Sequence, residues 1–182
     1  MDLENTTPGC GCGKGGLEAA IAEKIKEKKP LMLGMLAKEF GVTELEAARA
    51  LPAEMRRFAA RENFDAVWEA LTGWEAATFI MQHLGTVLEV KGAIPPGSYG
   101  HGYFNLKSSA GIGGHVKVDD LEAMAFMSMP FMGLESLSVQ FFNAAGEVKF
   151  SVYAGRNEQR EIIPAIRESF DAMRESLCKE GA

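Results

Sequence analysis

The sequence predicts an α+β fold, with N-terminal helices, a large mainly antiparallel β-sheet built from hairpins, and a C-terminal helix. Apolar residues recur every three or four positions in several stretches of residues 17–73, which is the spacing of amphipathic helices. Over much of residues 74–157 apolar and polar residues alternate, as in strands, and the helical period returns within residues 158–180. Because the strands follow one another with short connections, we expect them to pair antiparallel.

A single domain accounts for most of the chain. Its 182 residues are enough to bury a substantial core, and 47% of them are hydrophobic. We expect residues 17–182 to form this domain and residues 1–16, which have no apolar period, to form a disordered tail. Cys10 and Cys12 in the tail could bind a soft metal ion or form a strained disulfide, but two ligands do not complete a zinc site. A pair of solvated thiols is the favoured interpretation.

Charge and composition exclude several classes of protein. The net charge of −6 argues against a general nucleic-acid binder, which carries basic surface to meet phosphates. The chain has no run of about 18 or more apolar residues, so we expect no membrane partner. Its first residues lack the basic start and apolar stretch of a signal peptide. We therefore expect a cytoplasmic protein.

Residues 17–73 are expected to be helical. Pro30 ends a first amphipathic helix, and two short helices follow around Gly41, the second beginning with a capping box formed by Thr43 and Glu46. This pair resembles a helix-turn-helix, and a DNA-binding regulator is therefore an alternative function. The supposed recognition helix is acidic, however, so its charge would repel phosphate. Packing is the favoured role of these helices.

The segment from residue 74 to residue 157 is expected to form the sheet. Residues 77–83 and 86–91 form one predicted hairpin, and residues 137–141 and 148–152 form another. Residues 121–129 are a nearly unbroken apolar run, which predicts a strand buried on both faces, with a short buried helix as the alternative.

Residues 96–118 concentrate histidine and glycine in a segment that alternates like two strands. We expect residues 99–107 to form one strand and residues 113–118 to form its antiparallel partner. A connecting loop of four residues would place His115 on the face of Phe104, whereas a loop of five would place it on the face of Tyr103. A glycine-rich hairpin of this kind needs no ligand to exist, so solvated strand histidines remain the simpler interpretation of the pattern alone.

Several longer strings in the chain resemble one known family. They are GHGYFNL, GIGGH, PFMGLES and SVQFFNAAGEVKFSVYAGR, together with FDAVWEAL-x-x-W and LE-x-KG, and they span about residues 36–170. These strings resemble the cytosolic haem-utilisation carrier family of the HutX/ChuX type. The resemblance implies an intracellular, homodimeric haem-binding protein that carries haem after uptake and hands it to a haem-degrading or haem-accepting partner for storage or breakdown.

The resemblance also implies candidate haem ligands. One family histidine follows the GxGG-type turn and maps to His115, the first candidate for the axial ligand of haem iron. The position of the second holds Gln82, and His83 follows one residue later. Either a local irregularity at the turn after His83 lets this residue substitute, or the chain lacks that ligand and Gln82 at most holds a water. His101, in the family's HGYF string, is a further candidate for haem contact.

Other candidate residues have an ordinary alternative role. Cations near these histidines in sequence could meet the haem propionates or remain solvated, and they are Lys107, Lys117 and Arg156. Sulfur could ligate haem iron, although flexible core packing is the commoner role of methionine, and the candidates are Met124, Met127, Met129 and Met132.

A binding protein is favoured over an enzyme that degrades or modifies haem, which is the main alternative function. Gly111–Gly114 lies between strands and lacks the following helix of a dinucleotide site, so the sequence shows no site for a reductant. A haem-responsive DNA-binding regulator is less favoured still, for the charge reason given above.

Overall fold

The computed structural model describes residues 14–27, 29–107 and 111–178, so Cys10 and Cys12 lie outside the described residues. The helices are α1 (Lys14–Lys26), α2 (Leu33–Phe40), α3 (Glu44–Arg49), α4 (Phe64–Thr72) and α5 (Pro164–Leu177). The strands are β1 (Arg56–Ala60), β2 (Ala77–His83), β3 (Thr86–Gly92), β4 (Gly97–Gly100), β5 (Tyr103–Leu106), β6 (Gly114–Val116), β7 (Leu121–Phe131), β8 (Leu134–Asn143) and β9 (Val148–Ala154).

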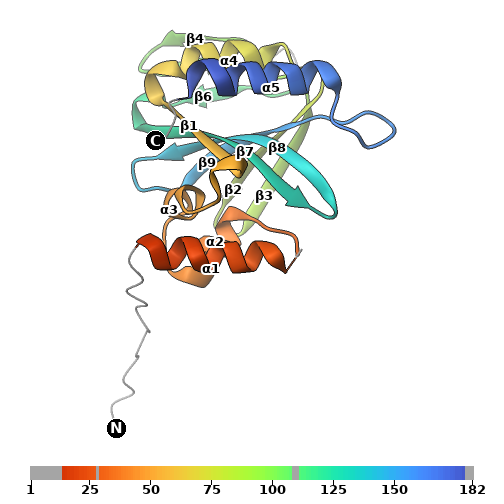
Figure 1. Cartoon of the computed structure of the whole chain (residues 1–182). Coiled ribbons are helices and arrows are strands. Elements are labelled where there is room, and N and C mark those ends of the chain that lie inside the picture. Colours follow the sequence, from red (N-terminus) through yellow and green to blue (C-terminus); the bar gives the residue numbers. More distant parts are fainter. Residues whose placement is uncertain (1–13, 28, 108–110, 179–182) are drawn as a thin grey trace.

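These elements form three layers, and the middle layer is a six-stranded sheet (Figure 1). The strand order of this sheet is β1-β7-β8-β9-β2-β3, and all of its pairs are antiparallel. The helices α1, α2 and α3 lie on one side, whereas α4, α5 and the small antiparallel sheet β4-β5-β6 lie on the other. The predicted α+β fold with an antiparallel sheet is confirmed.

The N-terminal helices have well-defined ends, and they pack against the sheet through small buried residues. Thr43 caps α3, because its Oγ1 accepts from the Glu46 backbone N–H while the Glu46 carboxylate accepts from the Thr43 backbone N–H. Gly41 ends α2 with a φ of 65°, which glycine adopts without a steric penalty. Ala47 and Ala48 on α3 are fully buried and belong to the hydrophobic cluster between these helices and β1, β7 and β8. The predicted capping box is therefore present.

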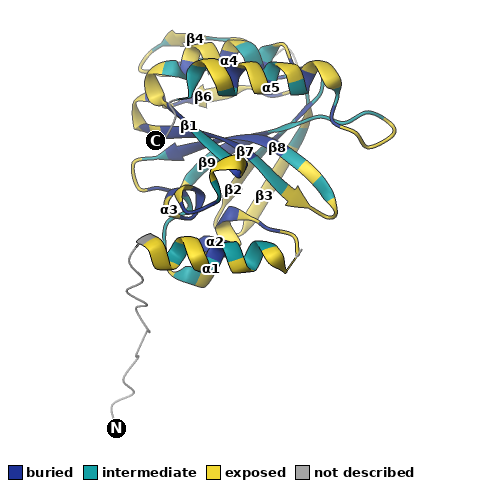
Figure 2. Cartoon of the chain, viewed as in Figure 1, coloured by how far each residue is buried: buried dark blue, intermediate teal, exposed yellow. Residues whose placement is uncertain are grey.

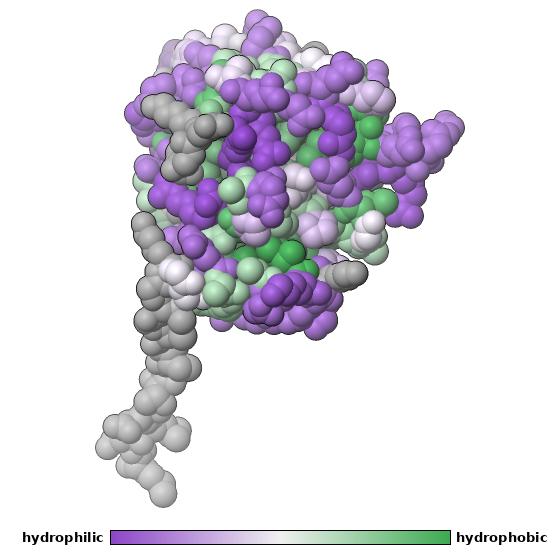
Figure 3. Space-filling view, viewed as in Figure 1, coloured by the Kyte–Doolittle hydropathy of each residue, from purple (hydrophilic) through white to green (hydrophobic). Residues whose placement is uncertain are grey.

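The larger hydrophobic cluster lies on the opposite face of the six-stranded sheet (Figure 2). Trp68 of α4 is its centre, because its ring lies against Phe104 of the small sheet and against Phe141 and Phe150 of the large one. Trp68 Nε1 also donates a hydrogen bond of 2.9 Å to the carbonyl of Pro95, in the connection between β3 and β4. Trp68 thus joins the small sheet to the rest of the fold. The outer surface over α4 and α5 is mostly hydrophilic, as expected for amphipathic helices (Figure 3).

Three element boundaries differ from those predicted. β1 lies in the part expected to be helical, and α1 begins at Lys14, three residues before the predicted start. The last helix begins at Pro164 and not at residue 158, because residues 156–162 form a turn closed by a bridge between Arg156 and Ile162. Residues 121–129 are part of the strand β7, so the alternative of a buried helix is wrong.

Candidate functional site

The GHGY segment forms a tight turn, so the predicted strand of residues 99–107 is wrong. His101 and Gly102 have φ values of 54° and 79°, and Gly100 pairs with Tyr103 across them. Two successive residues with positive φ form the kind of two-residue turn that matches the twist of antiparallel strands. The alternating pattern therefore conceals two strands, β4 and β5, and His101 lies in the turn and not on a strand face.

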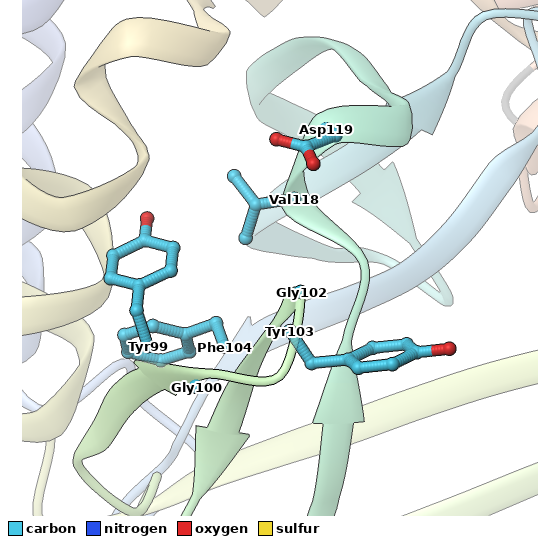
Figure 4. Close-up of a pocket in the computed structure, with 7 residues that line it drawn as sticks. All are labelled: Tyr99, Gly100, Gly102, Tyr103, Phe104, Val118 and Asp119. Atoms are coloured by element: carbon cyan, nitrogen blue, oxygen red, sulfur yellow. The ribbon is translucent and has the colours of Figure 1, made fainter.

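The small sheet has one buried and one exposed face. Phe104 and Val116 pair with each other and contribute to the core, whereas Asn105 pairs with His115 on the outer face. Tyr103 shares this outer face and points away from Phe104 and Tyr99 (Figure 4). His115 therefore lies on the face of Tyr103, which was one of the two alternatives that the sequence left open.

His115 is exposed but held by its neighbours. Its Nδ1 atom lies 2.6 Å from Oδ1 of Asn105, and its ring centroid lies 5.8 Å from that of Tyr103. Lys117 Nζ lies 5.5 Å from the centroid of the same tyrosine ring. Among the described residues, Nε2 of His115 has no hydrogen-bond partner. An imidazole nitrogen without a hydrogen-bond partner can bind the iron of a haem. The neighbouring aromatic ring and lysine could contact the porphyrin and its propionates.

Gln82 and His83 lie on the β2–β3 hairpin, away from this sheet. The ladder between β2 and β3 runs without a register shift, and a two-residue turn of Leu84 and Gly85 closes it. The local irregularity proposed for His83 is therefore absent. Gln82 and His83 are both exposed and point to opposite faces of the sheet, so His83 cannot replace Gln82 on the same face.

The structure does not bring the histidines of the two hairpins together within one chain. His83 ends β2 at the closed tip of its hairpin, and the connection to the small sheet leaves from Gly92 at the other end. The six residue steps from Thr86 to Gly92 correspond to about 20 Å of strand. Among the described residues, no hydrogen bond or ring contact joins His83 or His101 to His115.

The three candidate cations have different surroundings. Arg156 donates to the backbone carbonyls of Arg160 and Glu135, so its guanidinium supports a turn. Lys107 is exposed, and its backbone N–H donates to the carbonyl of Pro96. Lys117 is the candidate that shares a neighbour, Tyr103, with His115.

The candidate methionines are mostly structural. Met124 and Met127 are fully buried in the two core clusters, and Met129 packs against the second of them. Met132 is exposed in the turn between β7 and β8. Core packing, the commoner role, thus describes the first three.

Two small pockets lie beside the small sheet, on the side of Tyr99. Their volumes are about 130 Å³ and about 220 Å³, which are below the roughly 300 Å³ of a typical ligand pocket. Tyr99 donates a hydrogen bond of 2.6 Å to Asp65 of α4, and partial burial and this bond raise the pKa of Tyr99 to about 12. Both pockets lie on the Tyr99 side of the small sheet, whereas His115 is exposed on the other face.

Sequence analysis missed the pairing of Asn105 with His115 and that of Tyr99 with Asp65. The available signal is the alternation of residues 99–107, which places Asn105 on the same strand face as Tyr103. The register that sets Asn105 opposite His115 depends on the length of the loop between β5 and β6. Tyr99 and Asp65 are 34 positions apart, and no local pattern connects them.

Comparison with known proteins identifies the family. The sequence pattern of the family described as haem utilisation ChuX/HutX matches residues 57–173. The chain belongs to this family. HutX of Vibrio cholerae, described as an intracellular heme transport protein, is 36% identical over 160 residues, which are 87% of this chain and 83% of HutX. The resemblance noted in the sequence is thus confirmed.

Solved structures support the same assignment to the ChuX/HutX family. A protein from Erwinia carotovora has a TM-score of 0.81 at 30% identity, and the match covers 91% of this chain and 99% of that one. The heme-binding protein ChuX has a TM-score of 0.79 at 28% identity, with coverage of 88% and 98%. In the described part of this chain, no helix is long and apolar enough to cross a membrane.

Proposed function

We propose that this chain is an intracellular haem carrier, which binds haem after uptake and hands it to a protein that stores or degrades it. Its family, the transport function of HutX and the haem binding of ChuX support this proposal. The observation that carries it in this chain is His115, an exposed histidine with one ring nitrogen hydrogen-bonded and the other without a partner among the described residues. An open site of this kind suits a protein that must release its cargo.

In this proposal His115 Nε2 binds the iron, and nearby groups hold the porphyrin. Tyr103 offers an aromatic surface beside the iron ligand, and Lys117 offers a positive charge for a propionate. Among the described residues, no group of three or more His, Cys, Asp and Glu side chains is arranged to hold a bare metal ion. Gln82, His83 and His101 remain secondary candidates for haem contact, because all three are exposed.

A haem titration followed by absorbance distinguishes a carrier from a haem-degrading enzyme. We expect a saturable Soret shift at one haem per chain and an intact haem macrocycle after a reductant is added in air. Loss of the Soret band with formation of an open-chain tetrapyrrole would instead identify an enzyme. The absence of any saturable shift would contradict the proposal.

We also propose that the chain forms a homodimer through the β2–β3 hairpin. β3 is an edge strand of the large sheet, and an open edge with apolar side chains is prone to pair with another chain. Leu84 is 92% exposed, and Val87 and Leu88, which lie on opposite faces of β3, are 52% and 56% exposed. A second copy of this chain would cover these side chains.

Substituting Val87→Lys together with Leu88→Lys is expected to convert the dimer to a monomer, because two charges would be buried in an apolar interface. The measurement is the molar mass in solution by light scattering. Glu62→Lys, which adds a lysine at an exposed position outside the hairpin, is the control and is expected to remain dimeric. An unchanged dimer mass in the double variant would exclude this hairpin as the interface.

A further inference from the structure

We propose that Asn105 is a positioning residue that holds His115 in the tautomer whose Nε2 can bind iron. The purpose assigned to this contact rests on the proposed haem-carrier function, whereas the contact itself does not. Two observations support the proposal. One is the distance of 2.6 Å between Asn105 Oδ1 and His115 Nδ1, and the other is the set of hydrogen bonds that fixes the amide of Asn105.

Three backbone carbonyls determine which way the amide of Asn105 faces. Its Nδ2 atom lies 3.2 Å from the oxygen of Ser98, 3.0 Å from that of Gly100 and 3.2 Å from that of Tyr103. A carbonyl oxygen can only accept hydrogen bonds, so the NH₂ group must be the one that faces these three atoms. The Oδ1 atom of Asn105 is then the group that faces His115.

This orientation sets the position of the proton on His115. Oδ1 carries no hydrogen, so the contact is a hydrogen bond only if Nδ1 of His115 carries the proton. A neutral imidazole has one ring proton, and Nε2 therefore keeps its lone pair. Hydrogen bonds from the second ring nitrogen commonly fix the tautomer and the ring orientation of metal-binding histidines.

The turn that contains His101 supports the same arrangement. Gly100 and Tyr103 flank this turn, and their carbonyls are two of the three that hold the amide of Asn105. A Cβ atom at Gly100 would lie 3.2 Å from Nδ2 of Asn105, a tight contact that would push on the amide. The GHGYFN string therefore supports His115 through the backbone of the turn in which His101 lies.

The tautomer of His115 can be measured without haem, by ¹⁵N NMR of the histidine rings at alkaline pH, where the imidazole is neutral. We expect wild type to show a protonated Nδ1 and an unprotonated Nε2 at His115, and Asn105→Ala to show a mixture of both tautomers. Asn143→Ala, which removes an amide that holds the β8–β9 turn through Glu147, is the control and should leave His115 unchanged.

A haem titration of the same variants measures the consequence. Asn105→Ala is expected to weaken haem binding by about 10-fold to 100-fold, the usual cost of losing an outer partner of a metal ligand, while Asn143→Ala binds as wild type. A wild-type spectrum with Nε2 protonated at His115, or an Asn105→Ala variant with an unchanged tautomer, would overturn the proposal. If wild type shows the expected tautomer but binds no haem, the proposed function fails while the role of Asn105 in setting the tautomer stands.

Discussion

Replacing His115 by alanine is expected to lower the affinity for haem by at least about 100-fold, which corresponds to about 2.7 kcal/mol. His115 is the one of the three histidines whose ring has both a hydrogen-bonded Nδ1 and an aromatic neighbour among the described residues. Imidazole is a common axial ligand of haem iron, so its removal should leave only contacts to the porphyrin. The measurement is an absorbance titration of the protein with haem, read at the Soret band.

Three further variants separate the iron ligand from other exposed side chains. His101→Asn should retain the wild-type Soret band, because asparagine tolerates the positive φ of this turn position. His83→Ala and Gln82→Ala change exposed residues of β2 and test the secondary candidates. If His83→Ala or Gln82→Ala abolishes the Soret shift while His115→Ala retains it, the iron ligand lies on β2 and the assignment of His115 is wrong.

The hydrophobic pattern predicted most of the strands, and it failed where strands were short. The alternation from residue 77 to residue 83 gave β2, and its continuation from residue 86 gave β3. β1 has only five residues. Its sequence begins with two polar residues, Arg56 and Arg57, and continues with three apolar ones, so polar and apolar residues do not alternate along it. Its strand conformation depends on pairing with β7, which is more than 60 positions away in the sequence. No local pattern contains that information.

The turn at His101 was missed for a different physical reason. The residues on either side of this turn alternate without a break in the sequence, so the pattern predicts one strand with Tyr99 and Tyr103 on the same face. The turn instead pairs Tyr99 with Phe104 and places Tyr103 on the opposite face. The glycine at position 102 was the available signal, because glycine readily adopts positive φ. The first position of such a turn is usually Asn, Asp or Gly, so a histidine there, His101, does not indicate a turn.

The sequence was enough to select a candidate residue for the site, but it was not enough to predict the contacts of that residue. The resemblance selected His115, whereas the face on which it lies depends on the register between β5 and β6, which a change of one residue in loop length reverses. Asn105 became its partner only once that register was known. The same rule of alternation decides the case of Gln82 and His83, because an unbroken ladder sends neighbouring side chains to opposite faces.

Replacing Trp68 by alanine is expected to lower the free energy of unfolding by about 3–5 kcal/mol, the usual cost of removing a large buried aromatic side chain. Trp68 is 2% exposed, and its Nε1 donates to the carbonyl of Pro95, so the variant leaves a cavity and a buried carbonyl without its partner. For a chain of this size the melting temperature should fall by roughly 10 °C. Urea unfolding monitored by circular dichroism measures the change.

The same variant links the core to the site. Trp68 contacts Phe104, whose strand carries Asn105, and Phe104 pairs with Val116 beside His115. We therefore expect Trp68→Ala to weaken haem binding below the unfolding temperature, whereas Trp68→Phe, which keeps most of the ring contacts but loses the bond to Pro95, should retain more of both properties. Met132→Ala, at a position 70% exposed, should change stability by no more than about 0.5 kcal/mol. A loss of less than about 1 kcal/mol in Trp68→Ala would show that the small sheet is held to the large one by other contacts.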